Sequence, residues 1–181
     1  MVGIGAQQFD FGDAPASYAT LLANNGARHI ILPSNNPQLG ATIDAEAEGQ
    51  PTAGANGDDG NGDDEDGVVI PTLNPGLTAS VALSTGPTGG VVSCWIDYND
   101  DGDFADAGEL AISGLNLGSS ATQNVNVSVP ATAAEGSSYA RCRISSNAVA
   151  SFDGEAANGE VEDYVVTIAQ RRDFGDAPAS Y

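Results

Sequence analysis

A predicted strand leads directly into an acidic loop in the stretch Trp95-Ile96-Asp97-Tyr98-Asn99-Asp100-Asp101-Gly102-Asp103-Phe104, which continues to Gly108-Glu109. Oxygen-bearing side chains occupy alternate positions at Asp97, Asn99 and Asp101, and Gly102 follows where a tight loop requires a free backbone. Short loops that wrap a calcium ion place oxygen ligands in this way, because hard cations take several carboxylate and carbonyl oxygens at once. The stretch therefore predicts a calcium site at the end of a strand.

This loop departs from the calcium loop that lies between two helices. A strand precedes it, and the closing acid, Glu109, is the thirteenth residue when Asp97 is the first. A β-protein version of the loop is therefore predicted, with an acidic solvated turn as the alternative. Asp103 is expected to bind through its backbone carbonyl, and Asp106 is a spare candidate. The predicted first calcium site comprises Asp97, Asn99, Asp101, Asp103 and Glu109.

Short strands surround the loop at regular spacing. Seven alternating or apolar segments are separated by glycine or proline turns, at 68–70, 79–83, 91–98, 110–112, 125–129, 139–145 and 164–168. The clearest is 124–129, whose valines alternate with polar residues and are expected to face a core. This pattern predicts an all-β fold, an antiparallel β-sandwich of Ig-like or jelly-roll-like type, with long acidic loops and at most one short helix.

The N-terminal part carries weaker signals. Asp13 is predicted to cap a short helix with Pro15 in its first turn, ending near Gly26. Strands are expected at 28–32 and, weakly, at 39–46. Residues 49–67 contain glycine, asparagine and aspartate with no apolar side chain beyond alanine, so they are either a disordered linker or a loop ordered by ions.

One segment of nine residues occurs twice. Asp10-Phe11-Gly12-Asp13-Ala14-Pro15-Ala16-Ser17-Tyr18 recurs, at an offset of 163, as residues 173–181. A tandem array or a self-joining polymer is the simplest explanation, and a boundary artefact would still imply a repeating parent protein. The predicted organisation is an N-terminal segment at 1–9, a single calcium-stabilised module at 10–170, and the start of the next repeat or an inter-subunit linker at 171–181. The predicted subunit joint comprises Asp173, Phe174, Asp176 and Tyr181.

The chain is strongly acidic. Its 25 acidic and 5 basic residues produce a formal net charge of -20, which opposes compaction unless cations bind or salt is high. Nucleic acid is not an expected partner. All basic residues are arginine, so lysine chemistry is excluded. With one histidine and no plausible pair of nucleophile and base, we expect no enzyme. The chain also lacks a run of eighteen apolar residues, so we expect no membrane insertion.

Several buried roles are predicted for single residues. Cys94 and Cys142 both lie on the apolar side of a strand-like segment, and either a disulfide or two buried thiols fits this pattern. His29 is expected to be half-buried and structural. Trp95 is either a core residue or an exposed ring for sugar. Arg141 and Arg143 share a strand face with Tyr139, which predicts surface pairing with acids.

A second acidic cluster is predicted around residues 160–163. If Tyr164 faces the core, the strand period of two places Glu160 and Glu162 on the same face. Burying a charged carboxylate at the end of a core costs roughly several kcal/mol of folding free energy unless it is paired or bound to a metal, so a cation is expected here. A charged strand edge is the alternative. The candidate ligands are Glu160, Glu162 and Asp163, completed from Asp10 and Asp13, from Asp44 and Glu46, or from Asp64 and Asp66.

The segment Gly159-Glu160-Val161-Glu162-Asp163-Tyr164 resembles the signature of the GEVED domain, which occurs in modules of large secreted bacterial proteins, many of them adhesin-like or cell-surface. Further stretches are similar to the repeats that contain this domain: 10–15, 27–29, 39–46, 64–68, 95–109 and 141–144. The resemblance covers most of residues 10–168. It implies an extracellular β-sandwich module with a structural or adhesive role, but no particular ligand. Paired core cysteines are not expected from it.

Together these features predict a non-enzymatic, calcium-binding structural repeat module of an extracellular adhesin, matrix or filament protein. Calcium is the expected cofactor, and neighbouring copies of the module are the expected partners. The alternative is a calcium-dependent carbohydrate-binding module, in which the ion bridges hydroxyls of surface glycans and Trp95 or Tyr98 stacks on a sugar ring.

Overall fold

The protein folds almost entirely as β-structure. A computed structural model describes residues 7–57 and 64–171. Within them the strands are β1 (Phe9–Phe11), β2 (Arg28–Ile30), β3 (Val68–Val69), β4 (Thr78–Ser84), β5 (Gly90–Ile96), β6 (Leu110–Leu117), β7 (Thr122–Ser128), β8 (Gly136–Ser145), β9 (Glu155–Ala156) and β10 (Glu160–Ile168). All seven strands predicted from residue 68 onward are present, which confirms the all-β prediction.

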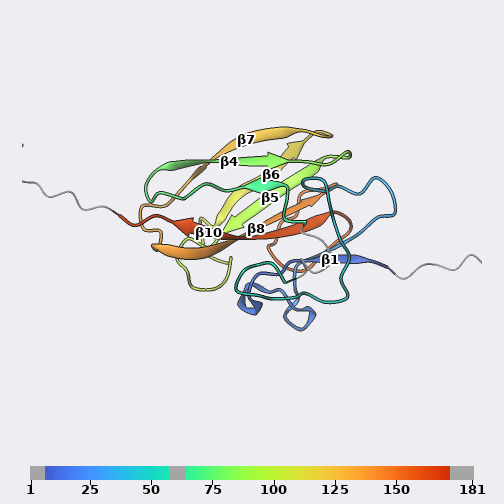
Figure 1. Cartoon of the computed structure of the whole chain (residues 1–181), viewed down its shortest axis with the longest axis horizontal. Helices are drawn as coiled ribbons and strands as arrows, with labels where there is room; N and C mark the ends of the chain where they lie inside the picture. The colour runs from blue at the N-terminus through green and yellow to red at the C-terminus, as the bar shows by residue number, and fades with distance from the viewer. Residues whose placement is uncertain (1–6, 58–63, 172–181) are drawn as a thin grey trace, which may run out of the picture.

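The strands form three sheets. The central sheet has the order β10-β8-β5-β6, and the cover sheet has the order β3-β4-β7. All pairs within these two sheets are antiparallel. The small N-terminal sheet has the order β1-β2-β9, and its β2–β9 pair is parallel. The cover sheet lies over one face of the central sheet, and the N-terminal segments lie over the other (Figure 1).

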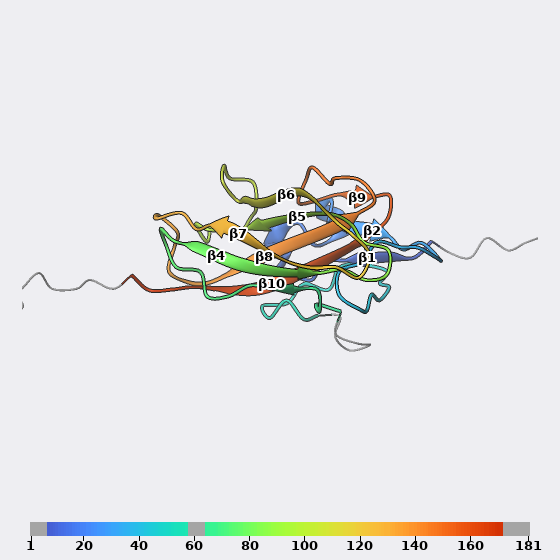
Figure 2. The same ribbon diagram turned by 90° about the horizontal axis from the view of Figure 1, so that it is seen from above.

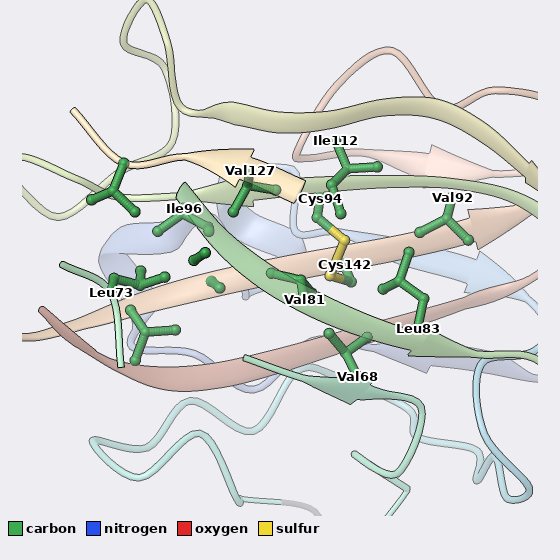
Figure 3. Packing of buried hydrophobic residues seen from close by; sticks show 14 of the residues in the cluster. Val68, Leu73, Val81, Leu83, Val92, Cys94, Ile96, Ile112, Val127 and Cys142 are labelled. Carbon is green, nitrogen blue, oxygen red and sulfur yellow. A yellow bond between two sulfur atoms is a disulfide. The ribbon is translucent and has the colours of Figure 1, made fainter. Parts of the chain in front are cut away.

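The main core fills the space between the central and cover sheets (Figure 3). Alternate residues of β5 point into it, among them Val92 and Ile96, and they meet Val81 and Val127 of the cover sheet. The valines of β7 face inward as predicted, because Val127 is buried while its neighbours Asn126 and Ser128 are exposed. Strands β5 and β7 thus follow the period-two rule on this side of the molecule, whereas the β5–β6 pairing has register shifts between Val92 and Cys94 and between Cys94 and Trp95.

A disulfide joins Cys94 and Cys142 inside this core. The two residues are direct partners in the register of β5 and β8, so the bond connects neighbouring strands of one sheet. Both cysteines are buried. Of the two alternatives left by the sequence, the disulfide is therefore the one observed.

The opposite face of the central sheet is also buried. A second cluster there contains Ala14, Tyr18, Trp95 and Phe104, which places Trp95 in a core. Arg141 and Arg143 lie on this face with no exposed surface, so the prediction that they pair at the molecular surface is wrong. The reason is that the N-terminal loops, which have no periodic pattern of their own, cover the sheet.

Several N-terminal predictions are also corrected. The predicted helix is replaced by two 3-10 turns, η1 (Ala16–Tyr18) and η2 (Leu22–Asn24), and Pro15 stands at the N-cap of η1 in place of Asp13. The weak strand at 39–46 is reduced to isolated bridges at Leu39 and Glu46. His29 is fully buried rather than half-buried.

Parts of two other predictions fall outside the described residues. They are residues 58–63 of the acidic loop and the joint residues Asp173, Phe174, Asp176 and Tyr181.

The disulfide should contribute strongly to stability. In the chain-entropy model it restricts the unfolded chain, and a loop of this length corresponds to about 2–5 kcal/mol. We therefore expect the oxidised chain to unfold at higher guanidinium concentration than the same chain reduced in denaturant and refolded with reductant. Because both cysteines are buried, reductant added to the native protein should leave the bond intact. Equal midpoints for the two forms would contradict this prediction.

Candidate metal centre

The acidic loop connects β5 to β6, and the hairpin itself brings its two ends together. Trp95 pairs with Leu110 across the hairpin, and the Ile96 amide donates to the Glu109 carbonyl at 2.9 Å. Asp97, which follows Ile96, and Glu109 are therefore held close together although the loop between them is long. Carboxylate oxygens of Asp97, Asp101 and Glu109 lie within 4.8 Å of one another.

Asp97 organises the loop from its buried position. Its Oδ1 accepts a hydrogen bond from the Asp100 amide at 2.6 Å, and its Oδ2 accepts one from the Gly102 amide at 3.1 Å. Gly102 has φ +94°, which glycine adopts readily and other residues rarely do. The first acid and the glycine of the predicted pattern thus serve the loop geometry directly.

One side-chain oxygen of Glu109 is unsatisfied in the part of the chain that the structure describes. Its side chain is 3 % exposed, and its Oε2 accepts from the Asp106 amide at 3.0 Å. Its Oε1 is buried without a hydrogen-bond partner among the described residues. Burial, followed by the charges of Asp97, Asp101 and Asp106, raises the pKa of Glu109 to about 7. A cation bound among the three carboxylates would supply the missing partner, so the donor set fits calcium.

The other predicted ligands lie around this group rather than inside it. Asn99 is exposed, and its amide donates to Asp101 at 3.0 Å and to Asp106 at 2.6 Å. The side chain of Asp103 accepts from the Ala105 amide at 2.7 Å. Of the five predicted ligands, the structure therefore gathers three side chains, and Asn99 holds the spare candidate Asp106 beside them.

The site also touches the N-terminal segment. The Tyr18 hydroxyl donates to Asp97 Oδ2 at 2.7 Å, and its ring packs against Phe104 with the ring centroids 4.8 Å apart. Burial and the Asp97 carboxylate raise the pKa of Tyr18, which keeps the phenol protonated as a donor. Sequence reasoning missed this contact, because Tyr18 lies 79 residues from Asp97 and belongs to no local pattern.

Asp163, from the second predicted cluster, pairs with an arginine. Arg141 Nε donates to Asp163 Oδ1 and Arg141 Nη2 donates to Asp163 Oδ2, each at 2.7 Å. Neither side chain has exposed surface. The two residues are register partners on β8 and β10, which places them side by side on one face. A guanidinium thus neutralises this carboxylate.

Glu160 and Glu162 are buried on the core side of β10, as predicted. Glu162 accepts from the Gly67 amide at 2.8 Å and from the Tyr164 hydroxyl at 2.8 Å. Glu160 accepts from the Leu39 amide. Burial raises the pKa of Glu162 to about 8, and burial together with the charge of Glu162 raises the pKa of Glu160 well above its usual range. Backbone amides and the Tyr164 hydroxyl thus satisfy both oxygens of Glu162 and Oε2 of Glu160, whereas Glu160 Oε1 is buried without a hydrogen-bond partner among the described residues.

Five of the six remaining acids of that cluster each accept a hydrogen bond from a different part of the backbone. Asp10 accepts from the Val161 amide, Asp13 from Gly57, Glu46 from Phe11, Asp64 from Asp44 and Asp66 from Ala41. Within residues 7–57 and 64–171, no second group of three acids has its oxygens as close together as the group at Asp97. The structure thus distributes these acids over several loops.

A buried arginine and histidine form a neighbouring polar centre that the sequence did not indicate. Arg143 Nε donates to His29 Nε2 at 3.0 Å, and its terminal nitrogens donate to the Asp153 and Gly154 carbonyls. His29 Nδ1 lies 2.7 Å from the Asn158 carbonyl and so carries the proton. Burial and the charge of Arg143 lower the pKa of His29, which keeps the ring neutral.

Residues 91–167 match the family model of the GEVED domain. This match covers nearly all of the segment from β5 to β10, including the acidic loop and the Arg141–Asp163 pair. No curated protein and no solved structure matches the chain. The described residues contain no helix long and apolar enough to cross a membrane.

The Arg141–Asp163 pair should be far more important for stability than an exposed pair. Asp163→Asn leaves a fully buried guanidinium without its counter-charge, so we expect the unfolding free energy to fall by about 3–5 kcal/mol. The matched control is Glu155→Gln in the Arg28–Glu155 pair, where Glu155 is 46 % exposed and the expected loss is below about 1 kcal/mol. Chemical denaturation of both variants measures the difference. Similar losses in the two variants would contradict the prediction.

The raised pKa of Glu162 also predicts a pH dependence. Because its pKa is about 8 in the folded chain and near the ordinary value when unfolded, the folded chain binds the proton more tightly. Its contribution is fully present below the unfolded pKa and is lost as pH rises towards about 8. In chelator, thermal unfolding across this window should therefore show decreasing stability, and Glu162→Gln should flatten the curve. An equally steep curve in the variant would assign the effect to other groups.

Proposed function

We propose that this chain is a non-enzymatic, calcium-binding structural repeat unit of an extracellular adhesin, matrix or filament protein. One observation carries the proposal: three carboxylates converge at the end of β5, and a buried oxygen of Glu109 has no partner in the described part of the chain. Hard cations satisfy such oxygens. The ion would also offset part of the net charge of -20.

The proposed role of the ion is mechanical. Its ligands stand at both ends of the β5–β6 loop, so binding closes a hairpin of the central sheet. Through the Tyr18–Asp97 hydrogen bond, the same ligand is connected to the N-terminal segment. Because such a site does not exist in the unfolded chain, binding free energy becomes folding free energy.

The disulfide supports an extracellular location. Structural disulfides persist in oxidising compartments and are rare in the cytosol. The match of residues 91–167 to the GEVED domain agrees with the secreted setting that the resemblance implies. Neighbouring copies of the unit are the proposed partners, with the repeated nine-residue segments as the joints.

A carbohydrate-binding function has one observation in its favour. A cavity of about 350 Å³ lies beside the acidic loop, lined in part by Tyr98, Glu109 and Pro130. However, Trp95 and Tyr98 are each only 4 % exposed, so neither ring offers a platform for a sugar. The structural role is therefore the better supported of the two.

Calcium should stabilise the chain against heat. At a calcium concentration of about 100 times Kd, the expected gain is about 2.7 kcal/mol, which corresponds to a rise in Tm of several degrees. Asp101→Asn removes one of the three converging carboxylates and should weaken calcium binding at least about ten-fold. Titration calorimetry and thermal unfolding, with and without chelator, measure both effects.

The matched control is Asp100→Asn in the same loop. It makes the same change in charge at an exposed residue outside the converging group, and asparagine tolerates the φ of +57° found there. Its calcium affinity should stay close to that of the unchanged chain. The proposal fails if calcium leaves the Tm unchanged, or if both variants lose affinity equally.

A further inference from the structure

The repeated segment Asp10–Tyr18 is held tightly on the outer face of the central sheet. Asp10 accepts from the Val161 amide at one end, the Ala14 amide donates to Asp163 at 2.8 Å in the middle, and the Tyr18 hydroxyl reaches Asp97 at the other end. We call the surface that receives it the docking face, which consists of Asp97, Phe104, Tyr139, Arg141, Val161 and Asp163.

The docking face is built around buried charge. Arg141 donates to the Tyr18 carbonyl at 2.7 Å while it pairs with Asp163, and Asp163 in turn accepts from Ala14. The Tyr18 ring fills the space between Phe104 and Tyr139. If this face lost its segment, the buried ion pair would lose two hydrogen bonds and an apolar cover.

Residues 173–181 carry the same groups in the same order. Asp173, Ala177 and Tyr181 stand where Asp10, Ala14 and Tyr18 stand in the first copy. Because the sequences are identical over all nine residues, the docking face offers the same contacts to either segment. Exchange of identical elements between copies is a low-cost route to assembly.

The second segment cannot take the place of Asp10–Tyr18 on its own copy, because Asp173 would have to lie beside Val161, as Asp10 does. Val161 lies about 23 Å from Ile168 along β10, at about 3.3 Å per residue. Beyond Ile168 the chain continues away from Val161, because the Ala169 amide donates to the Leu73 carbonyl and Arg171 donates to the Ala133 carbonyl. Only two residues follow from Arg171 to Asp173, a reach of about 7 Å.

The two ends of the described chain favour an end-to-end arrangement. β1 lies towards one end of the long axis, and the chain leaves β10 at the other (Figures 1 and 2). A segment that follows β10 is therefore placed to meet the β1 end of a second copy.

We propose that Asp173–Tyr181 of one copy docks on the docking face of a second copy, in the place that Asp10–Tyr18 holds in this structure. The inference rests on the proposed structural repeat unit and specifies its joint. In the joint, Tyr181 donates to Asp97 of the second copy, so the segment that links the units contacts the proposed calcium loop. Asp10–Tyr18 of the second copy competes for the same docking face at an effective concentration of about millimolar order, because it belongs to the same chain as that face. Assembly therefore depends on protein concentration.

A pair of matched variants tests this joint in the full chain. A Cβ built at Gly12 would lie 2.4 Å from Asp163 Oδ2 and 2.9 Å from Arg141 Nη2, so Gly175→Val should be excluded from the docking face. Ser17 is exposed, so Ser180→Val adds the same side chain at a position that tolerates it. Sedimentation velocity over a concentration series and electron microscopy report assembly.

The unchanged chain and Ser180→Val should assemble as concentration rises, and Gly175→Val should raise the association Kd at least about ten-fold. The inference is overturned if Gly175→Val assembles like the unchanged chain, or if the unchanged chain stays as single units at every concentration. Calcium titration of Gly175→Val separates the two proposals. If Gly175→Val binds calcium but does not assemble, both the proposed function and the proposed joint are supported. If the unchanged chain assembles, Gly175→Val does not, and neither binds calcium, the proposed function alone is overturned.

Discussion

The buried ion pair between Arg141 and Asp163 is the interaction on which the outer half of the molecule depends. Two charges without exposed surface carry a large desolvation cost, which is offset only when their remaining donors and acceptors are satisfied. Here the Tyr18 and Phe152 carbonyls and the Ala14 amide provide this satisfaction. The loops thus stabilise the buried ion pair, and the ion pair in turn binds the loops. This mutual stabilisation explains how segments with little regular structure pack against the sheet.

Acidic side chains serve a second purpose in this protein. Residues 10–57 and 64–67 contain few strand residues, so many of their backbone amides have no partner in a sheet. Carboxylates take that role: Glu46 accepts from Phe11, Glu162 from Gly67, and Asp66 from Ala41. Hydrogen bonds to charged acceptors are stronger than those between neutral groups. A high acidic content is thus compatible with an ordered fold, because part of the charge acts inside the molecule.

Sequence patterns predicted the sandwich well, because alternate residues of its strands are apolar on the side that faces the main core. The valines around Val127 and the cysteines of β5 and β8 follow that rule. The acidic loop was also recognisable, since Asp97 and Gly102 lie close in sequence. The family match to residues 91–167 is narrower than the resemblance, which extended over most of residues 10–168.

The N-terminal loops that cover the central sheet were not predicted from the sequence, and the reason is physical. Their contacts join residues far apart in sequence, such as Ala14 with Asp163, and no local period marks them. Arginines on a strand face ordinarily indicate solvent, and burial of Arg141 becomes evident only once its register partner and the covering loops are known. The helix was predicted from Asp13 as a cap and Pro15 in the first turn, and two short 3-10 turns occur in its place.

The disulfide would also limit extension of the unit in the mechanical role proposed above. A pull applied between β1 and β10 would load β10 against β8 along the strand direction, so their backbone hydrogen bonds would resist together rather than open one at a time. If these strands yielded, the 48 residue steps from Cys94 to Cys142 would still be closed by a covalent bond. About 160 Å of contour length would thus be withheld from extension. Extension of the yielded unit would be confined to the residues on either side of this loop.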